Sequence, residues 1–360
     1  MKKIQFFNRE CIVEVYNENN RKGCTYYGRS HTRNTENDFI GARIEFLVQK
    51  TLEKNNLPTA VIKIYGVKNV NNKEELKTQA LQKNAFIRLF AGYSADFDND
   101  NLTPIFEGNV ITATPIHQAP DNYIMLYCVT CSAVRAKRLP SVSLKGKITL
   151  DNILSSLNGK IQDIGYTIDT LSLKNIYDGY SNNIISNRGF STNGTTNISG
   201  FLDDITNSIS TKEDKFTWFV DDNSKKIKFS NLIYFNKNNG KKNTQFTLIR
   251  GVNAKLVDNS SVERNNRELY YKSVIQNDNK LTAIQKKQGQ IGRQTGGYKD
   301  SIIISTPIIQ GVNLSTKYNF KNFDNLPPNI SINTMRWIGD THSHGDDWKI
   351  EYIFSYERRN

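Results

Sequence analysis

The stretch PIFEGNVITATPIHQAPDNYIMLYCVTCSAV, residues 104–134, shows most clearly how this chain folds. Two runs of apolar and β-branched residues, 104–118 and 123–134, flank a polar segment that contains Pro120, Asp121 and Asn122. Proline, aspartate and asparagine favour turns, whereas isoleucine, valine, threonine and tyrosine favour strands. The stretch therefore predicts two antiparallel strands joined by a turn.

Two earlier runs repeat this alternation of strand and turn. The run AVIKIYGV, residues 60–67, carries apolar side chains at alternating positions and is followed by an asparagine-rich segment. The run AFIRLFAGYSAD, residues 85–96, has Gly92 before a polar turn. Successive strands separated by turns are typical of an antiparallel sheet or barrel. We therefore predict a first β-barrel-like domain over residues 1–138, with residues 1–58 as an N-terminal extension.

The composition changes near residue 138 and predicts a small mixed α/β module over residues 139–243. Apolar residues between 148 and 157 fall at helical spacing, and Asp151 is placed to start the helix. GFLDDITNSIS, residues 200–210, predicts a second helix. KFTWFVDDNSKKIKFSNL, residues 215–232, predicts a hairpin that turns at DDNSKK.

Strand patterns return in residues 244–360. The segments 305–320, 329–343 and 347–359 each combine β-branched and aromatic residues, and the first two also contain Pro or Gly turn signals. We therefore predict a second β-barrel-like domain here. The expected fold class is mainly β with α+β, in which two barrel-like antiparallel β-domains flank the small mixed α/β module.

A glycine-rich basic segment, residues 283–300, interrupts this third region. It has few apolar residues and lacks the Gly-Lys-Ser/Thr sequence of a phosphate-binding loop, so we interpret it as a surface loop. Its side chains could contact an acidic partner, or nucleic acid with the tyrosine as a stacking residue. The candidate contact residues are Lys286, Lys287, Arg293, Tyr298 and Lys299.

The overall composition restricts the function classes. The 48 basic and 35 acidic residues give a net charge of +13, but the lysines are scattered among asparagines, which does not indicate a dedicated phosphate-binding surface. No run approaches the roughly 20 apolar residues of a membrane helix, and Glu10 and Glu14 interrupt any secretory signal. The four cysteines are too few for a disulfide framework, so we expect them to be reduced.

The sequence THSHGDD, residues 341–347, contains the strongest candidate for metal chemistry. His342, His344 and Asp346 match part of the His-x-His-x-Asp-His motif of metallo-β-lactamase-type hydrolases, but Asp347 stands where the last histidine would be. No histidine follows it to complete a ligand set. We interpret the segment as a polar loop between strands, and we expect no metal, no cofactor and no enzymatic activity.

The spacing Cys128-x-x-Cys131 matches that of thioredoxin-like redox sites. A redox pair requires a helix N-terminus that lowers a thiol pKa, whereas this pair falls in a predicted strand, where residues three apart point to opposite faces. We therefore predict two ordinary buried cysteines.

The order of these segments resembles that of phage-type tail baseplate hub proteins, the hub family of contractile and related tails. It is also similar to the base of type VI secretion spike proteins. A strand pair that ends at Gly92-Tyr93 precedes a Phe-x-Gly strand at 106–108 and a closing strand, as in the family's first domain. Residues 139–243 look like its middle module, and residues 336–354 resemble its closing hairpin around a His-containing turn.

The resemblance implies a homotrimeric ring that adapts a six-fold tail tube to a three-fold central spike or tip. Two β-domains per chain in three chains would supply six similar units. The implied partners are other copies of the chain, the tail tube protein, the spike or tip protein and the tape-measure protein, with DNA passing through the channel. The implied location is the virion tail baseplate, after synthesis in the bacterial cytoplasm. Two alternatives stay open, namely a metal-dependent hydrolase and a basic module that binds nucleic acid or polysaccharide.

Overall fold

The structure is a computed structural model. It describes residues 9–16, 22–28, 38–52, 57–66, 85–93, 103–118, 121–161, 164–192, 196–211, 216–222, 224–231, 245–250, 253–257, 299–314, 316–323, 330–343 and 347–357.

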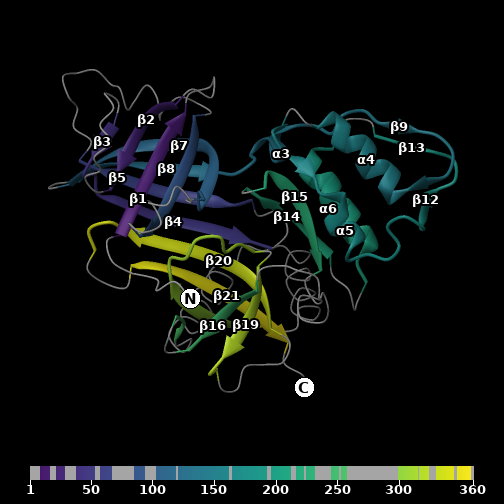
Figure 1. Ribbon diagram of the computed structural model, residues 1–360. Helices are drawn as coiled ribbons and strands as arrows, with labels where there is room; N and C mark the ends of the chain where they lie inside the picture. The colour runs from purple at the N-terminus through teal and green to yellow at the C-terminus, as the bar shows by residue number, and fades with distance from the viewer. Residues whose placement is uncertain are drawn as a thin grey trace, which may run out of the picture.

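A twelve-stranded sheet contains most of the β-structure (Figure 1). Its strand order is β17-β18-β21-β20-β4-β5-β8-β7-β6-β1-β2-β3, and every neighbouring pair except β2 and β3 is antiparallel. The predicted mainly β fold with α+β character is confirmed. In chain order the strands are β1 (Arg9–Tyr16), β2 (Lys22–Tyr27), β3 (Asp38–Ile40), β4 (Ile44–Thr51), β5 (Thr59–Tyr65), β6 (Phe86–Tyr93), β7 (Phe106–Gln118), β8 (Asp121–Val129), β17 (Lys255–Val257), β18 (Lys299–Pro307), β20 (Ile330–Asp340) and β21 (Trp348–Glu357).

Strands β4 and β20 join the first and third regions of the chain in this one sheet. They pair from Thr51 opposite Thr334 to Glu45 opposite Asp340. Both predicted β-domains therefore contribute strands to a single hydrogen-bonded sheet, and the division of the chain at residues 138 and 243 stays a prediction.

The N-terminal segment supplies interior strands of the sheet. β1 lies between β6 and β2, and β4 lies between β20 and β5. Val13 and Val15 of β1 are fully buried in the main hydrophobic core. The described strands within residues 1–58, a segment that the sequence suggested as an extension, thus help to complete that core.

The middle module packs beside the sheet, and its hairpin β14–β15 lies between the sheet and the helices (Figure 1). A two-stranded parallel pair, β16 (Gln245–Ile249) with β19 (Lys317–Lys321), lies near the C-terminal strands. The predicted second helix and hairpin are present as α6, β14 and β15. The elements of the module are α3 (Ala133–Ala136), β9 (Ser143–Leu144), β10 (Ile148–Thr149), α4 (Leu150–Lys160), β11 (Thr167–Ile168), α5 (Thr170–Lys174), β12 (Ile184–Ser186), β13 (Phe190–Ser191), α6 (Ile198–Ile209), β14 (Phe216–Asp221) and β15 (Lys226–Asn231).

The N-cap of helix α4 is two residues earlier than the predicted start at Asp151. Thr149 is its N-cap and accepts a hydrogen bond from the backbone N–H of Asn152, whose side chain accepts one from the Thr149 N–H in return. The reciprocal pair satisfies two amides at the helix start. Asp151 therefore lies in the first turn, where its charge complements the helix dipole, and is not the cap.

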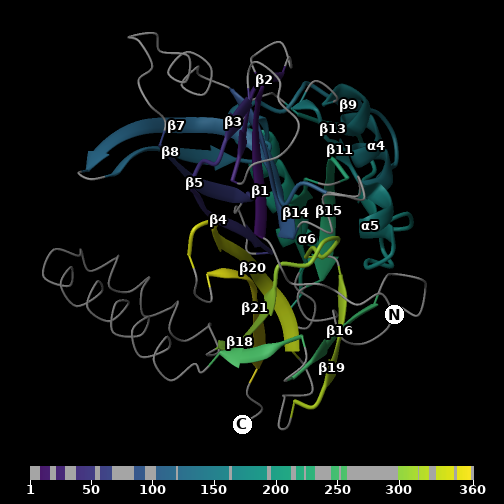
Figure 2. The ribbon, with the colours of Figure 1, turned by 60° about the vertical axis from the view of Figure 1, so that its left-hand side comes forward.

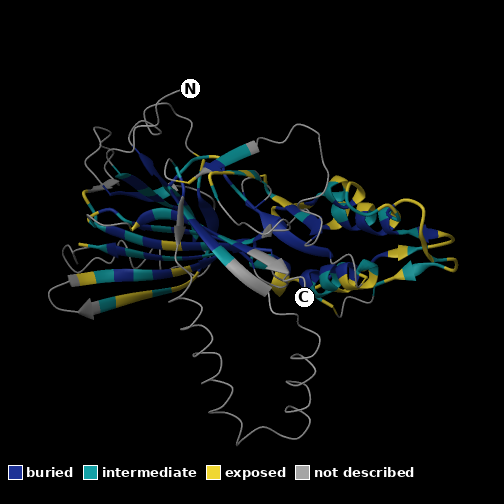
Figure 3. Cartoon of the chain, turned by 90° about the horizontal axis from the view of Figure 1, so that it is seen from below, coloured by how far each residue is buried: buried dark blue, intermediate teal, exposed yellow. Residues whose placement is uncertain are grey.

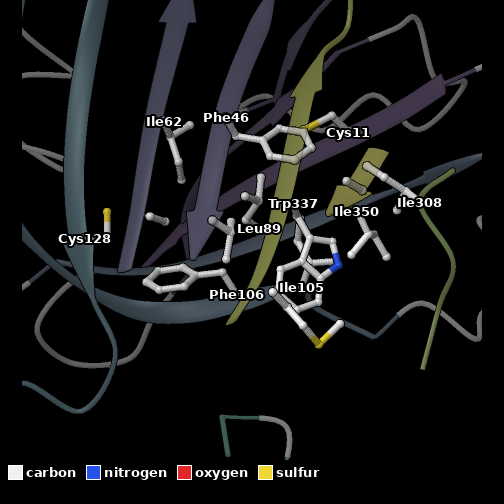
Figure 4. Close-up of a cluster of buried hydrophobic side chains, with 14 of the residues drawn as sticks. Cys11, Phe46, Ile62, Leu89, Ile105, Phe106, Cys128, Ile308, Trp337 and Ile350 are labelled. Atoms are coloured by element: carbon white, nitrogen blue, oxygen red, sulfur yellow. The ribbon is translucent and has the colours of Figure 1, made fainter. Parts of the chain in front are cut away.

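The large sheet and the middle module each have a hydrophobic core. In the main core, side chains from distant parts of the sequence, including Leu89, Phe106 and Trp337, meet inside the large sheet (Figure 4). The module has a core of its own around Leu154 and Leu202. Figure 3 shows buried residues along the strands and exposed residues over the outer sides of the module helices.

Strand β8 ends at Val129, before the predicted end at residue 134. Cys131 has a φ of 52°, in the left-handed region, and lies in the turn that leads into α3. The prediction that both cysteines of the Cys-x-x-Cys lie in one strand is therefore wrong, because the chain leaves the sheet between them. Both side chains are buried as free thiols. Among the described residues, no helix is long and apolar enough to cross a membrane.

Candidate assembly site

A buried ion pair connects the large sheet to the middle module. Lys50 is near the end of β4, and Asp222 directly follows β14. The Lys50 ammonium nitrogen lies 2.6 Å and 2.8 Å from the two carboxylate oxygens of Asp222, and both side chains are buried. The same nitrogen lies 5.1 Å from the ring centre of Trp337 in β20. One lysine thus contacts the first, middle and third regions of the chain.

Burial raises the pKa of Asp222, while the adjacent Lys50 charge and hydrogen bond act in the opposite direction. An unpaired charge at this depth would lose its hydration without compensation, so each partner depends on the other. Such a pair contributes little net stability compared with a well-packed apolar pair, but it accepts only one geometry. We interpret it as a contact that defines how the module sits on the sheet.

A second polar contact joins the turn of the β14–β15 hairpin to the large sheet. Glu107 of β7 is buried and forms ion pairs with Lys225, in the β14–β15 turn, and with Arg88 of β6, the latter at 2.6 Å. Lys225 has a φ of 53°, a left-handed conformation that the turn imposes. Its ammonium also lies over the Tyr166 ring at 5.5 Å. The hairpin therefore contacts the sheet at two charged points, Asp222 and Lys225.

A neutral hydrogen bond strengthens the same junction. Thr217 of β14 is buried, and its hydroxyl donates to the backbone carbonyl of Leu52, 3.0 Å away. Leu52 directly follows β4, so this bond and the Lys50 pair hold the hairpin against the same end of the strand.

On the side of β6, none of the described strands pairs with β7 beyond Val110. β6 pairs with β7 only over Phe106–Asn109, and the Val110 N–H donates to the carbonyl of Ala85. From Ile111 onward, β7 pairs on its other side with β8 alone. Figure 2 shows this hairpin extending past the neighbouring strands. An open edge offers backbone groups to a strand from another chain.

Of the three candidate metal ligands, His342 alone lies within the described residues. His342 is exposed in the turn after β20, its ring Nδ1 lies 2.9 Å from the Thr341 hydroxyl, and its backbone N–H donates to Asp340. His344 and Asp346 lie outside the described residues. Among the residues that are described, no three His, Cys, Asp or Glu side chains come together in a metal-binding arrangement. The metal-ligand candidates and the hydrolase alternative therefore stay untested.

The candidate contact loop lies almost wholly outside the described residues. Lys286, Lys287, Arg293 and Tyr298 are not described, and Lys299 is the first residue of β18, opposite Glu357 of β21. The role of these residues in contacting a partner stays a prediction.

Sequence reasoning missed the junction residues Lys50, Asp222 and Glu107. One signal was available for Lys50, because Phe46, Val48 and Lys50 alternate along β4 and share the inward face. The hairpin turn that holds Asp222 was predicted, but no local pattern shows that a turn carboxylate is buried against another part of the chain.

The fold of this chain has counterparts among solved structures. No family model and no curated protein sequence matches the chain. Among solved structures it is similar to the 43 kDa tail protein of prophage MuSo2 from Shewanella oneidensis, with 12% identity, 97% of each chain covered and a TM-score of 0.53. It is also similar to the tail protein from Neisseria meningitidis MC58, with 9% identity, 97% of each chain covered and a TM-score of 0.51.

These comparisons establish a shared fold over almost the whole chain. The protein has the architecture of phage-type tail proteins, and the likeness to tail proteins expected from the order of its segments is confirmed at the level of the fold.

Proposed function

We propose that this protein is a structural component of a phage-type tail baseplate. It would form a homotrimeric ring that adapts a six-fold tail tube to a three-fold central spike or tip. The observation that carries the proposal is the shared fold with two tail proteins over 97% of the chain. Its partners would be the tube, spike and tape-measure proteins, with DNA passing through the channel.

The symmetry of the role suits the arrangement of β-structure. The regions before and after the middle module each contribute antiparallel strands to the large sheet. Three copies would therefore present six strand-rich units on one side while keeping three-fold symmetry overall. Such a role needs fixed relative positions of sheet and module, which the Lys50–Asp222 pair and the Glu107 contacts support.

The proposed role is structural and requires no catalytic group. Mass measurement of the native purified protein, followed by electron microscopy, tests it. We expect a species of three chains that forms a three-fold ring with a central channel. A strict monomer at every concentration, both alone and with a tail tube protein, or a ring of another symmetry, would overturn the proposal.

A further inference from the structure

Strand β7 runs through an uncharged segment of high strand propensity. Residues 108–120 contain no Asp, Glu, Lys or Arg, and residues 110–114 are mostly β-branched. Ile111 is 53% exposed, and on the side of β6 none of the described strands pairs with β7 beyond Val110. A strand that is uncharged and open along one edge tends to pair with another copy of itself.

The hydrogen bonds of β8 show which residues of β7 face this open edge. The Gly66 N–H donates to the Asn122 carbonyl (3.3 Å), and the Thr130 N–H donates to the Pro58 carbonyl (2.9 Å). Gly66 and Pro58 flank β5, which pairs with β8 without a shift of register. Backbone groups of successive residues point to opposite sides of a strand. The even-numbered residues of β8 therefore face β5, and the odd-numbered ones face β7.

The same alternation turns Pro115 toward the open edge. Thr112, Thr114 and Ile116 lie opposite odd-numbered residues of β8, so their backbone groups face that strand. The backbone groups of Ala113 and Pro115 consequently point away from β8, to the side where none of the described strands pairs. Proline has no N–H, and its ring lies where a neighbouring strand would approach. Pro115 thus costs no hydrogen bond with β8, but it removes a donor from the open edge.

Residue 115 is also the middle one of the outward-facing positions 113, 115 and 117. Two copies that paired antiparallel along these positions would place residue 115 of one copy opposite residue 115 of the other. The N–H donors of this central pair are missing, and the two proline rings would meet between the strands. Proline at an exposed edge is one of the devices that prevent edge-to-edge association of sheets.

We propose that Pro115 prevents the β7–β8 hairpin of one copy from pairing edge to edge with the same hairpin of another copy. The proline protects the uncharged segment from self-association and leaves the pairing of β7 with β8 intact. This protection concerns one edge of the single chain, so it goes beyond the proposed ring and does not depend on it.

Pro115→Thr tests the role of the proline, because it restores the missing donor and matches the neighbouring threonines. The restored N–H faces away from β8, so the variant should keep the wild-type circular dichroism spectrum. The matched control is Ala113→Pro with Pro115→Thr, which moves the proline to another outward-facing position. Light scattering over a concentration series measures self-association, and hydrogen exchange of individual backbone amides identifies the edge involved.

We expect Pro115→Thr to associate beyond the wild-type species at a roughly tenfold lower concentration, because the central hydrogen bonds of the pairing are regained. The Ala113 amide should be protected in the associated variant. In the wild type the same amide should exchange rapidly, whereas the amides of Thr114 and Ile116, which face β8, should be protected. The control should associate no more than the wild type.

Equal association of Pro115→Thr and the wild type would overturn the protective role, and so would a control that associates as strongly as Pro115→Thr. A protected Ala113 amide in the wild type would overturn it as well, because the edge would then already be paired. That measurement needs no substitution and therefore tests the native chain directly. Failure of the proposed ring is a separate result, given by the number of chains in the wild-type species.

Discussion

At position 339 of β20, the backbone passes directly beside two aromatic rings. A Cβ atom added to Gly339 would lie 2.2 Å from Cζ of Phe46 and 2.9 Å from Cζ3 of Trp348. Both rings are buried in the main core and pack edge to face, with centroids 5.4 Å apart. Glycine is therefore required here for close packing between β20 and its neighbours, β4 and β21.

We expect Gly339→Ala to destabilise the protein by about 1–3 kcal/mol, since an added methyl group must displace packed side chains. Gly159→Ala in α4 is the control, because nothing lies within 4 Å of the added Cβ atom. Alanine is the better helix former by roughly 0.5–1 kcal/mol, so the control should be as stable as the wild type or more so. Urea unfolding measures both, and equal midpoints for the two variants would contradict this account.

The four cysteines provide a second test at the residue scale. All four are buried free thiols, and burial raises the pKa of Cys11, Cys128 and Cys131, that of Cys131 to about 12. The thiolate is the reactive form, so the folded protein should react very slowly with a thiol-specific dye at pH 8. In urea, which unfolds the chain and exposes the thiols, all four cysteines should react rapidly with the dye. Rapid labelling of one thiol per folded chain would show that this cysteine is not buried in the folded protein.

At the scale of elements, the hairpin β14–β15 connects the module to the sheet through charged contacts in a buried setting. Its strands belong to the module core through Trp218 and Phe229, yet Asp222 and Lys225 at its turn pair with residues of the large sheet. The hairpin therefore contacts both the module core and the large sheet, and these contacts fix how the module lies against the sheet.

Lys50→Met should destabilise the protein by about 3–5 kcal/mol, because Asp222 would remain buried without its counter-charge. Adding Asp222→Leu should restore most of that loss, since an apolar pair of similar volume avoids the desolvation cost of both charges. Urea unfolding of the two single variants and the double variant completes the cycle. Additive losses in the double variant would mean that the two side chains do not interact.

At the scale of the whole molecule, two hydrophobic cores are coupled through one junction. The main core lies within the large sheet and the second within the middle module. Each is extensive enough to unfold as a unit, so the junction determines whether they unfold together.

We expect a single calorimetric transition for the wild type. In the triple variant Lys50→Met, Asp222→Leu and Lys225→Ala, both charged contacts from the hairpin to the sheet are absent. This variant should show two transitions, because the sheet and the module then melt independently. Ser155→Lys provides a control far from the junction. A single transition in the triple variant would show that apolar packing alone couples the two cores.

Local sequence patterns determined where most secondary structure lies. Alternating apolar residues predicted β5, β6, β7 and the β14–β15 hairpin, and helical spacing predicted α4 and α6. Side-chain preferences for strand, helix and turn act over a few residues, so they can be read along the chain. The order of these segments also predicted the fold shared with tail proteins.

Only the tertiary structure decided how these elements meet. The pairing of β4 with β20 joins residues 45–51 with residues 334–340, and β1, β2 and β4 of the N-terminal segment lie inside the sheet. Long-range pairing depends on which surfaces complete a common core, and a local pattern does not encode it. The same reason explains Lys50 and Asp222, whose sequence surroundings suggest surface charges and whose burial exists only once the module packs on the sheet.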